Sequence, residues 1–179
     1  MFLIEFDQVI DEGVYDPHIF KAIFMAGSPG AGKTTVAKAL FSHTGLRTIN
    51  VDKFWELSKQ TGREINYKRF YNLTQQQKEN FLHGRLGVII DSTARNPERM
   101  KAVKAELESL GYDTAMIFVN TSLETSKERV LAREQETGRH VAEEYVEKTW
   151  IEVQKSLGSI QAMFGRNFYI IDNNEKPDY

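Results

Sequence analysis

Apolar and polar positions follow two different periods along the chain. Short runs that are apolar at most positions are typical of strands covered on both faces, and they fall at 21–26, 46–51, 86–91, 112–120 and 167–172. The longer segments between them have helical signals and predict helices at 33–41, 52–60, 67–82, 97–110, 122–134 and 142–157. This alternation predicts an α/β fold, a parallel five-stranded sheet with helices on both faces.

The helix expected at 97–110 carries signals at both ends. Asn96 can cap it, Pro97 suits its first position, and Gly111 ends it. Its buried face is predicted to consist of Met100, Val103, Leu107 and Leu110.

The next two helices are separated by a polar break at 135–140. Thr121 and Glu124 have the spacing of a capping box, which predicts that the first of them begins at 122. The second is expected to turn four residues inward: Val146, Trp150, Val153 and Leu157.

A glycine-rich turn joins the first strand to the first helix. Its sequence from Gly27 to Thr34, GSPGAGKT, has the Walker A spacing. Such a loop turns its backbone amide hydrogens toward phosphate oxygens, so we expect Lys33 to reach the β- and γ-phosphates of ATP and the Thr34 hydroxyl to ligate Mg²⁺. The predicted nucleotide-binding residues in this segment are Gly27, Ser28, Pro29, Gly30, Ala31, Gly32, Lys33, Thr34 and Thr35.

Asp91 ends the apolar run at 86–91, on a strand expected beside this turn. An acid there suits a Walker B role, in which it holds Mg²⁺ directly or through water. The alternative is an ordinary strand-end aspartate that caps a turn. The predicted metal-binding residues are therefore Thr34 and Asp91.

The composition limits the class of protein. With 179 residues, 41% of them hydrophobic and 27% charged, the chain is long enough for one domain with a sizeable core. No apolar run approaches the ~18 residues of a membrane span, and the acidic residues within 1–20 do not fit a signal peptide. The chain has no cysteine, a net charge of −2 and a pI of about 6.1, which excludes disulfides and the global basic field of a dedicated nucleic-acid binder. We expect a cytoplasmic protein without membrane contact.

Phosphoryl transfer fits the remaining motifs better than GTP hydrolysis, because the sequence has neither an N-K-x-D segment nor the glycine of a D-x-x-G switch. A kinase needs a base for the acceptor hydroxyl. Asp52, just past the second strand, is the candidate, and its alternative role is a helix N-cap. A kinase also needs cations at the transferred group, for which the candidates are Arg129, Arg133 and Arg139.

Two segments are expected to close around the ligands. The first is a lid over 129–142, in which Arg129 and Arg133 share one helix face; the alternative is a solvated, charged helix. The second is a helical insertion over 52–85 that mixes aromatic and basic residues. This mixture can stack bases and follow a phosphate backbone, or it can be an ordinary core face with a wet face. The rest is one domain over 1–179 with an N-terminal arm over 1–20.

Four segments also resemble known kinases. GSPGAGKTT, NVDKF, DSTARNPER and RVLAREQETGRH resemble the kinase domain of bacteriophage-type 5′-polynucleotide kinases, zeta-toxin-like kinases, and phage P-loop kinases that phosphorylate hydroxymethyl groups on DNA bases. The resemblance covers about residues 21–150. It implies a P-loop NTPase fold, a three-layer sandwich with a mobile helical lid.

By position, the resemblance implies that Lys33 and Thr34 hold ATP and magnesium and that Asp52 is the general base. Arg129 and Arg133 become lid arginines, with Arg133 also contacting the nucleotide. The residues implied to meet the acceptor are Asp52, Lys53, Thr93, Arg95 and Arg139. Two departures are visible: there is no room for a fused phosphatase domain, and only Lys53 and Arg95 stand near the positions of the basic residues that grip the acceptor's phosphate.

The sequence thus predicts an ATP- and Mg²⁺-dependent kinase that phosphorylates a hydroxyl. The first expected acceptor is a nucleic acid, DNA more than RNA, at a 5′-end or a hydroxymethylated base. The alternatives are a small-molecule kinase acting on a nucleotide sugar or nucleoside, and a module that senses ATP without transferring its phosphate. No obligate protein partner is indicated, and a phage-encoded protein would act in the host cytoplasm.

Overall fold

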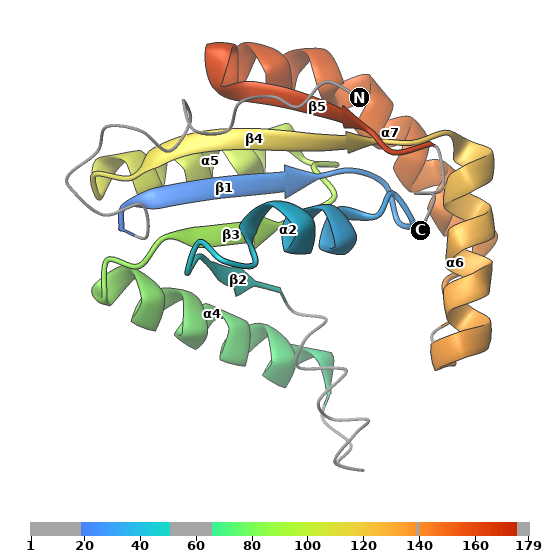
Figure 1. Cartoon of the computed structure of the whole chain (residues 1–179), viewed down its shortest axis with the longest axis horizontal. Coiled ribbons are helices and arrows are strands. Elements are labelled where there is room, and N and C mark those ends of the chain that lie inside the picture. The colour runs from blue at the N-terminus through green and yellow to red at the C-terminus, as the bar shows by residue number, and fades with distance from the viewer. Residues whose placement is uncertain (1–18, 51–65, 139, 175–179) are drawn as a thin grey trace.

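A parallel sheet is the centre of the molecule. The computed structural model describes residues 19–50, 66–138 and 140–174. Within them, five strands form one sheet in the order β2-β3-β1-β4-β5, and every neighbouring pair is parallel (Figure 1). The strands are β1 (Lys21–Ala26), β2 (Arg47–Ile49), β3 (Val88–Asp91), β4 (Asp113–Asn120) and β5 (Phe168–Asp172). The predicted five-stranded parallel sheet is confirmed.

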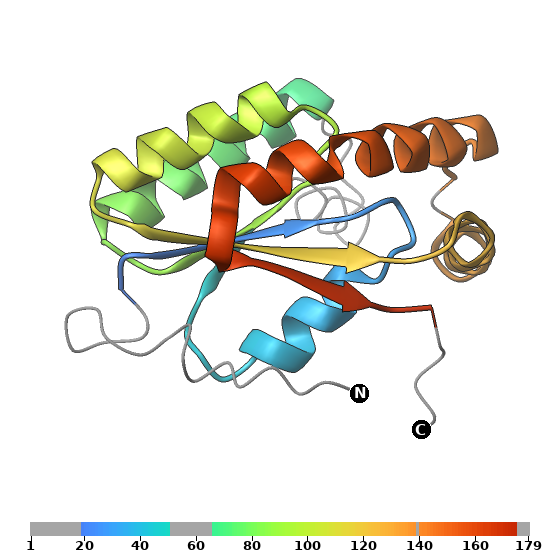
Figure 2. The same cartoon turned by 90° about the horizontal axis from the view of Figure 1, so that it is seen from above.

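Helices cover both faces of this sheet (Figures 1 and 2). One face carries α2 (Lys33–Phe41), and the other carries α4 (Tyr67–His83), α5 (Pro97–Ser109) and α7 (Glu143–Phe164). α6 (Leu123–Thr137) crosses the edge at which the strands end and is seen end-on in Figure 2. A 3-10 turn, Gly165–Asn167, joins α7 to β5. Among the described helices, none combines the length and apolar character needed to cross a bilayer.

The central strand β1 shows why the sheet is buried on both faces. Ala22 and Phe24 belong to the core beneath α5 and α7, whereas Ile23 and Met25 belong to the core beneath α2. Because successive side chains of a strand point to opposite faces, a strand with a continuous apolar run requires a cover on each side. All of its residues are buried. Two hydrophobic cores therefore hold the sheet between its helical layers.

The predicted start of α5 is confirmed, but the prediction of its buried face is wrong at one residue. The side chain of Asn96 accepts a hydrogen bond of 2.9 Å from the backbone N–H of Arg99, and Pro97 is the first helical residue. Leu107 is fully buried, but Leu110 is 49% exposed. The helix ends at Ser109, so Leu110 no longer follows the helical period that would turn it inward.

Both ends of α6 differ from expectation. Ser122, not Thr121, caps α6, and its hydroxyl accepts from the N–H of Thr125 at 3.1 Å. Thr121 is buried and its hydroxyl donates to the carbonyl of Asn173 at 3.5 Å instead, which removes it from the cap. The polar segment after 134 stays helical up to Thr137.

The helix α7 continues past position 157, where the sequence pattern suggested an end. Val153, Ile160 and Phe164 are all buried on one face, so the apolar period runs through Gly158. A single glycine costs a helix only about 1 kcal/mol, which the burial of this face outweighs. The helix predicted over 52–60 and residues 1–18 of the arm predicted over 1–20 lie outside the described residues.

Candidate functional site

The backbone conformation and the tight packing of the turn after β1 require its glycines. Gly27, Gly30 and Gly32 have φ angles of 148°, 80° and 87°. A Cβ on Gly27 would lie 2.5 Å from the carbonyl oxygen of Val119, and one on Gly30 or Gly32 would also collide with neighbouring atoms. Because only glycine tolerates both the conformation and the close approach, the loop keeps the shape of a phosphate cradle.

The residues after this turn place charge and hydroxyls at its opening. The ammonium of Lys33 donates to the carbonyl oxygens of Gly27 and Ser28 at 2.9 and 3.0 Å, which holds it over the loop. Thr34 and Thr35 are exposed on the first turn of α2. The loop's amides, the positive end of α2 and Lys33 together form a site that favours phosphate oxygens.

Helix α6 packs directly on the cradle. The hydroxyls of Ser28 and Ser126 form a hydrogen bond of 2.8 Å, and both residues are buried. The backbone of Gly30 lies so close to Ser126 that a Cβ on this glycine would meet the Ser126 carbonyl. The expected lid helix is thus anchored to the phosphate-binding loop through its first turns.

The segment after β5 joins the same assembly. The side-chain amide of Asn173 donates to the carbonyl of Ala31 at 2.7 Å, and Arg129 donates to the carbonyl of Asn173 at 2.8 Å. A Cβ built on Gly32 would be 3.8 Å from the Arg129 guanidinium, so this arginine reaches the cradle. Arg133 follows one turn later on α6 and is half-buried. The predicted role of Arg129 and Arg133 as lid cations stays a prediction.

Asp91 lies at the end of β3, next to the strand that enters the cradle. Its register partner on β1 is Met25, and one carboxylate oxygen accepts a hydrogen bond of 2.7 Å from the side-chain amide of Asn50. Among the described residues, no group of three or more His, Cys, Asp or Glu side chains could hold a metal ion. A site with one carboxylate, a threonine hydroxyl and phosphate oxygens still fits Mg²⁺, because this ion commonly binds through one or two carboxylates and substrate phosphates.

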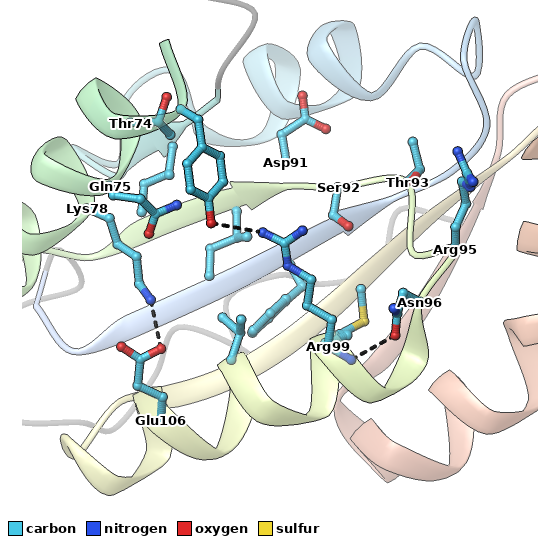
Figure 3. A pocket seen from close by; sticks show the side chains of 16 residues that line it. Thr74, Gln75, Lys78, Asp91, Ser92, Thr93, Arg95, Asn96, Arg99 and Glu106 are labelled. Atoms are coloured by element: carbon cyan, nitrogen blue, oxygen red, sulfur yellow. Dashed lines mark hydrogen bonds and ion pairs between the residues drawn. The ribbon is translucent and has the colours of Figure 1, made fainter. Parts of the chain in front are cut away.

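A cavity of about 660 Å³ opens beside Asp91, on the side of the sheet away from α2 (Figure 3). Thr93 lies at the same end as Asp91, on the segment between β3 and α5. The lining residues are Phe24, Ile49, Tyr71, Thr74, Gln75, Lys78, Ile90, Asp91, Ser92, Thr93, Arg95, Asn96, Arg99, Met100, Val103 and Glu106. A second, separate compartment thus meets the cradle at Asp91.

Arg95 lines this cavity but is also tied to α7. Its guanidinium donates to Glu152 at 2.7 Å and to the hydroxyl of Tyr145 at 3.2 Å, and it lies 5.4 Å from the centre of the Tyr145 ring. Partial desolvation lowers the pKa of Arg95, but the hydrogen bond to Tyr145 and the charge of Glu152 more than offset this, so the pKa is raised. Arg95 therefore stays cationic, and its charge is paired with that of Glu152 on α7.

Three of the predicted site residues, Asp52, Lys53 and Arg139, lie outside the described residues. Their roles as general base, acceptor contact and lid cation stay predictions. The described members of the predicted set fall in two groups: the cradle residues with Arg129 and Arg133 of α6, and the cavity residues Asp91, Thr93 and Arg95.

Three further residues at this site were not identified from the sequence: Asn50, Ser126 and Asn173. Asn50 and Asn173 directly follow β2 and β5, so the rule that parallel strands present their carboxyl ends at one edge could have indicated them. Ser126 has no such signal, since a serine inside a polar helix is ordinary and only packing shows that it meets Ser28.

The family model described as Zeta toxin matches residues 16–178, nearly the whole chain. The chain belongs to the Zeta toxin family. The predicted zeta-toxin-like resemblance is thereby confirmed. None of the curated proteins matches this sequence.

Solved structures share the fold at low sequence identity. A chain of the Pnkp1/Rnl/Hen1 RNA repair complex is 22% identical with a TM-score of 0.65, over 79% of this chain and 46% of that chain. The PezAT toxin-antitoxin structure of Streptococcus pneumoniae is 21% identical with a TM-score of 0.65, over 96% and 76%. The AvrRxo1-ORF1:AvrRxo1-ORF2 structure with sulphate ions is 16% identical with a TM-score of 0.69, over 87% and 55%.

These likenesses confirm the P-loop NTPase fold that the motifs predicted. The present chain spans about half the length of two of these relatives, 46% and 55%. Further likenesses include a putative kinase from Chloroflexus aurantiacus, at 15% identity and a TM-score of 0.61.

Proposed function

We propose that this chain is an ATP-dependent phosphotransferase with an alcohol as acceptor. The observation that carries the proposal is that two compartments meet at the end of β3. The backbone N–H of Ser92 donates to the carbonyl of Met25 at 3.0 Å, two residues before the cradle begins, and Ser92 and Asp91 also line the cavity. A donor seated in the cradle and an acceptor seated in the cavity would approach each other there. Membership of the Zeta toxin family and the kinase-type fold support this arrangement.

The chain's own residues divide the work as follows. Lys33 and the loop amides bind the β- and γ-phosphates, and Thr34 and Asp91 would hold the Mg²⁺ that ATP brings, with Asn50 orienting Asp91. Arg129 and Arg133 offset charge on the moving group. Asp52 accepts the proton of the acceptor hydroxyl. A new bond forms from that oxygen to the γ-phosphorus, and the bond between this phosphorus and the β–γ bridging oxygen breaks, which leaves ADP.

The acceptor we favour is a small nucleotide-like molecule rather than a strand. A cavity of about 660 Å³ lies in the range of small-molecule sites, and the net charge of −2 gives no long-range attraction for a polyanion. This choice corresponds to the small-molecule alternative drawn from the sequence, a nucleotide sugar or nucleoside.

The second candidate acceptor is a nucleic acid, at a 5′-hydroxyl or a hydroxymethylated base of phage DNA. Two observations favour it. Lys68 and Arg69 are exposed on the first turn of α4, and the fold recurs in a chain of an RNA repair complex. Exposed cations can bind the phosphates of a strand.

A direct test is transfer from labelled ATP to nucleotide sugars, nucleosides, 5′-hydroxyl oligonucleotides and hydroxymethylated DNA. Transfer to a polynucleotide should weaken steeply with added salt, whereas transfer to a small molecule should respond mildly. Lys33→Ala should lose about 100-fold or more in turnover because it removes a charge that meets the transferred group. Slow ADP release that no acceptor accelerates would contradict the transferase proposal and would support an ATP-sensing module.

The general base has its own test. Asp52→Asn should abolish transfer and keep ATP binding nearly unchanged, since a neutral amide cannot take up the proton. Asp113→Asn is the matched control, because Asp113 begins β4 at the opposite edge of the sheet and pairs with Lys21 at 2.6 Å. Full activity of Asp52→Asn would refute the assignment of the base.

A further inference from the structure

The cavity beside Asp91 continues as a groove between α4 and α5 that is closed at its far end. Its floor is apolar and consists of Phe24, Ile49, Ile90, Met100 and Val103. Lys78 of α4 and Glu106 of α5 form an ion pair of 2.8 Å across the end away from Asp91 and Thr93 (Figure 3). A ligand that enters beside Asp91 therefore meets a wall, which fits a compact molecule.

One cation of the lining stands apart from the others. Lys78 is paired with Glu106 and Arg95 with Glu152, at 2.8 and 2.7 Å. Arg99 contacts no carboxylate among the described residues; its guanidinium meets the hydroxyl of Tyr71 across the groove at 3.5 Å. In Figure 3 its guanidinium projects from α5 into the middle of the cavity, toward the side of Ser92 and Asp91.

Arg99 is exposed, so its guanidinium is open to a ligand that enters the groove. Its hydrogen bond of 3.5 Å to a neutral hydroxyl is weak and is readily exchanged for stronger ones to a ligand. A bidentate oxyanion would supply two charge-assisted hydrogen bonds, for which the planar fork of arginine is suited. The Tyr71 hydroxyl, on a side chain that is 37% exposed, can donate to the same anion.

We propose that Arg99, assisted by Tyr71, binds an oxyanion of the acceptor, a phosphate or a carboxylate, so that the acceptor hydroxyl is held near Asp91. This inference rests on the proposed function, because it assigns the cavity to the acceptor. It makes Arg99 a specificity-determining residue: the chain phosphorylates alcohols that carry a negative group and rejects their neutral analogues, which narrows the favoured acceptors to nucleotide sugars and leaves out nucleosides.

The test uses the full chain with its cradle filled by Mg²⁺ and a non-hydrolysable ATP analogue, so that added anions cannot bind there. The readout is the side-chain Nε–H signal of Arg99 in a ¹⁵N spectrum, assigned by its loss in Arg99→Gln. Ribose 5-phosphate is titrated against ribose, and gluconate against glucose. We expect a saturable shift with at least one of the two anions and none with the neutral partners, and the responding anion identifies phosphate or carboxylate.

Calorimetric titration of the variants gives the affinities. Arg99→Gln should weaken binding of the responding anion by at least about tenfold, in line with the loss of charge-assisted hydrogen bonds. The affinity of Arg99→Lys should be intermediate, since lysine keeps the charge but cannot form two parallel hydrogen bonds to the anion. Lys101→Gln is the matched control: it removes one positive charge from an exposed position of the same helix, outside the cavity lining, and should bind as the parent chain does.

Two results would overturn the inference: neither anion binds to the parent chain, or Arg99→Gln binds the anion as tightly as Lys101→Gln does. In both cases the ATP analogue would still bind, so the part of the proposed function that concerns the phosphate donor would stand. Failure of the analogue to bind would instead refute the proposed function itself. Arg99→Lys and Tyr71→Phe keep the inference testable if Arg99→Gln does not fold.

Discussion

The contact between the phosphate cradle and α6 can be measured through one glycine. Gly30 has a φ of 80°, and a Cβ at this position would collide with the carbonyl oxygen of Ser126, a backbone atom that cannot rotate away. Gly30→Ala therefore combines a backbone penalty with a steric one. The first cost is about 1–2 kcal/mol for an L-residue in the left-handed region. The second is about 1–3 kcal/mol for overpacking, so the expected loss is about 2–5 kcal/mol.

The chain offers two matched glycines that separate these penalties. Gly138 ends α6 with a φ of 68° and a Cβ there would meet nothing within 4 Å, so Gly138→Ala should cost only the backbone term of about 1–2 kcal/mol. Gly158 lies inside α7 and also has open space around it, without a positive φ. Gly158→Ala should stabilise the protein by about 0.5–1 kcal/mol, because alanine favours a helix.

Urea unfolding followed by circular dichroism gives the three free energies under one set of conditions. The expected order of stability is Gly158→Ala, parent chain, Gly138→Ala, Gly30→Ala. Thermal unfolding should give the same order, with about 2–4 °C for each kcal/mol in a chain of this size. If Gly30→Ala were no less stable than Gly138→Ala, α6 would not press on the cradle, and the coupling between α6 and the phosphate loop would be refuted.

Three further predictions concern stability. Ser122→Ala should cost about 1 kcal/mol in urea unfolding because it removes the cap of α6, and an unchanged midpoint would contradict this cap. Leu107→Ala should cost about 2–5 kcal/mol and Leu110→Ala less than about 1 kcal/mol, since the first is fully buried and the second is 49% exposed; equal losses would refute the observed face of α5. A hydrogen bond from Lys104 lowers the pKa of Glu108, so its contribution is present at neutral pH and is lost as the pH falls through that lowered value. Glu108→Gln should therefore be less stable at neutral pH by no more than about 1 kcal/mol, because the pair is solvent-exposed, and the gap should close in acid; a gap that widened would contradict the sign.

The sequence was sufficient to predict an element wherever a short segment carried all the features that define it. The bounds of β1 and α2 were predicted correctly, because a continuous apolar run, a glycine turn and a helical segment follow one another without ambiguity. The cap at Asn96 was correct for the same reason: Asn followed by Pro leaves few alternatives. The cap of α6 was wrong because Thr121 and Ser122 are both good capping residues, and a distant partner, Asn173, engages the first of them.

The cavity could be predicted only in part. Asp91 was identified by its place at the end of a strand, and Thr93 and Arg95 by the resemblance to known kinases; all three line one cavity. The wall opposite them is α4, and no local pattern indicates how α4 faces α5 or that Lys78 and Glu106 close the groove. The significance of Arg99 depends on which carboxylates reach it, and this is a property of packing.

The amino-acid sequence by itself determined the parallel α/β sheet, the phosphate cradle and the carboxylate at the end of β3. Each of these is encoded within a few consecutive residues, by period, by glycine and by the requirement of backbone amides for phosphate. Only the tertiary structure decided that Ser126 and Asn173 complete the cradle, that α7 engages Arg95, and that Arg99 is left facing a closed groove. These contacts join residues far apart in the chain, and their energies depend on burial and on partners that the sequence does not place next to one another.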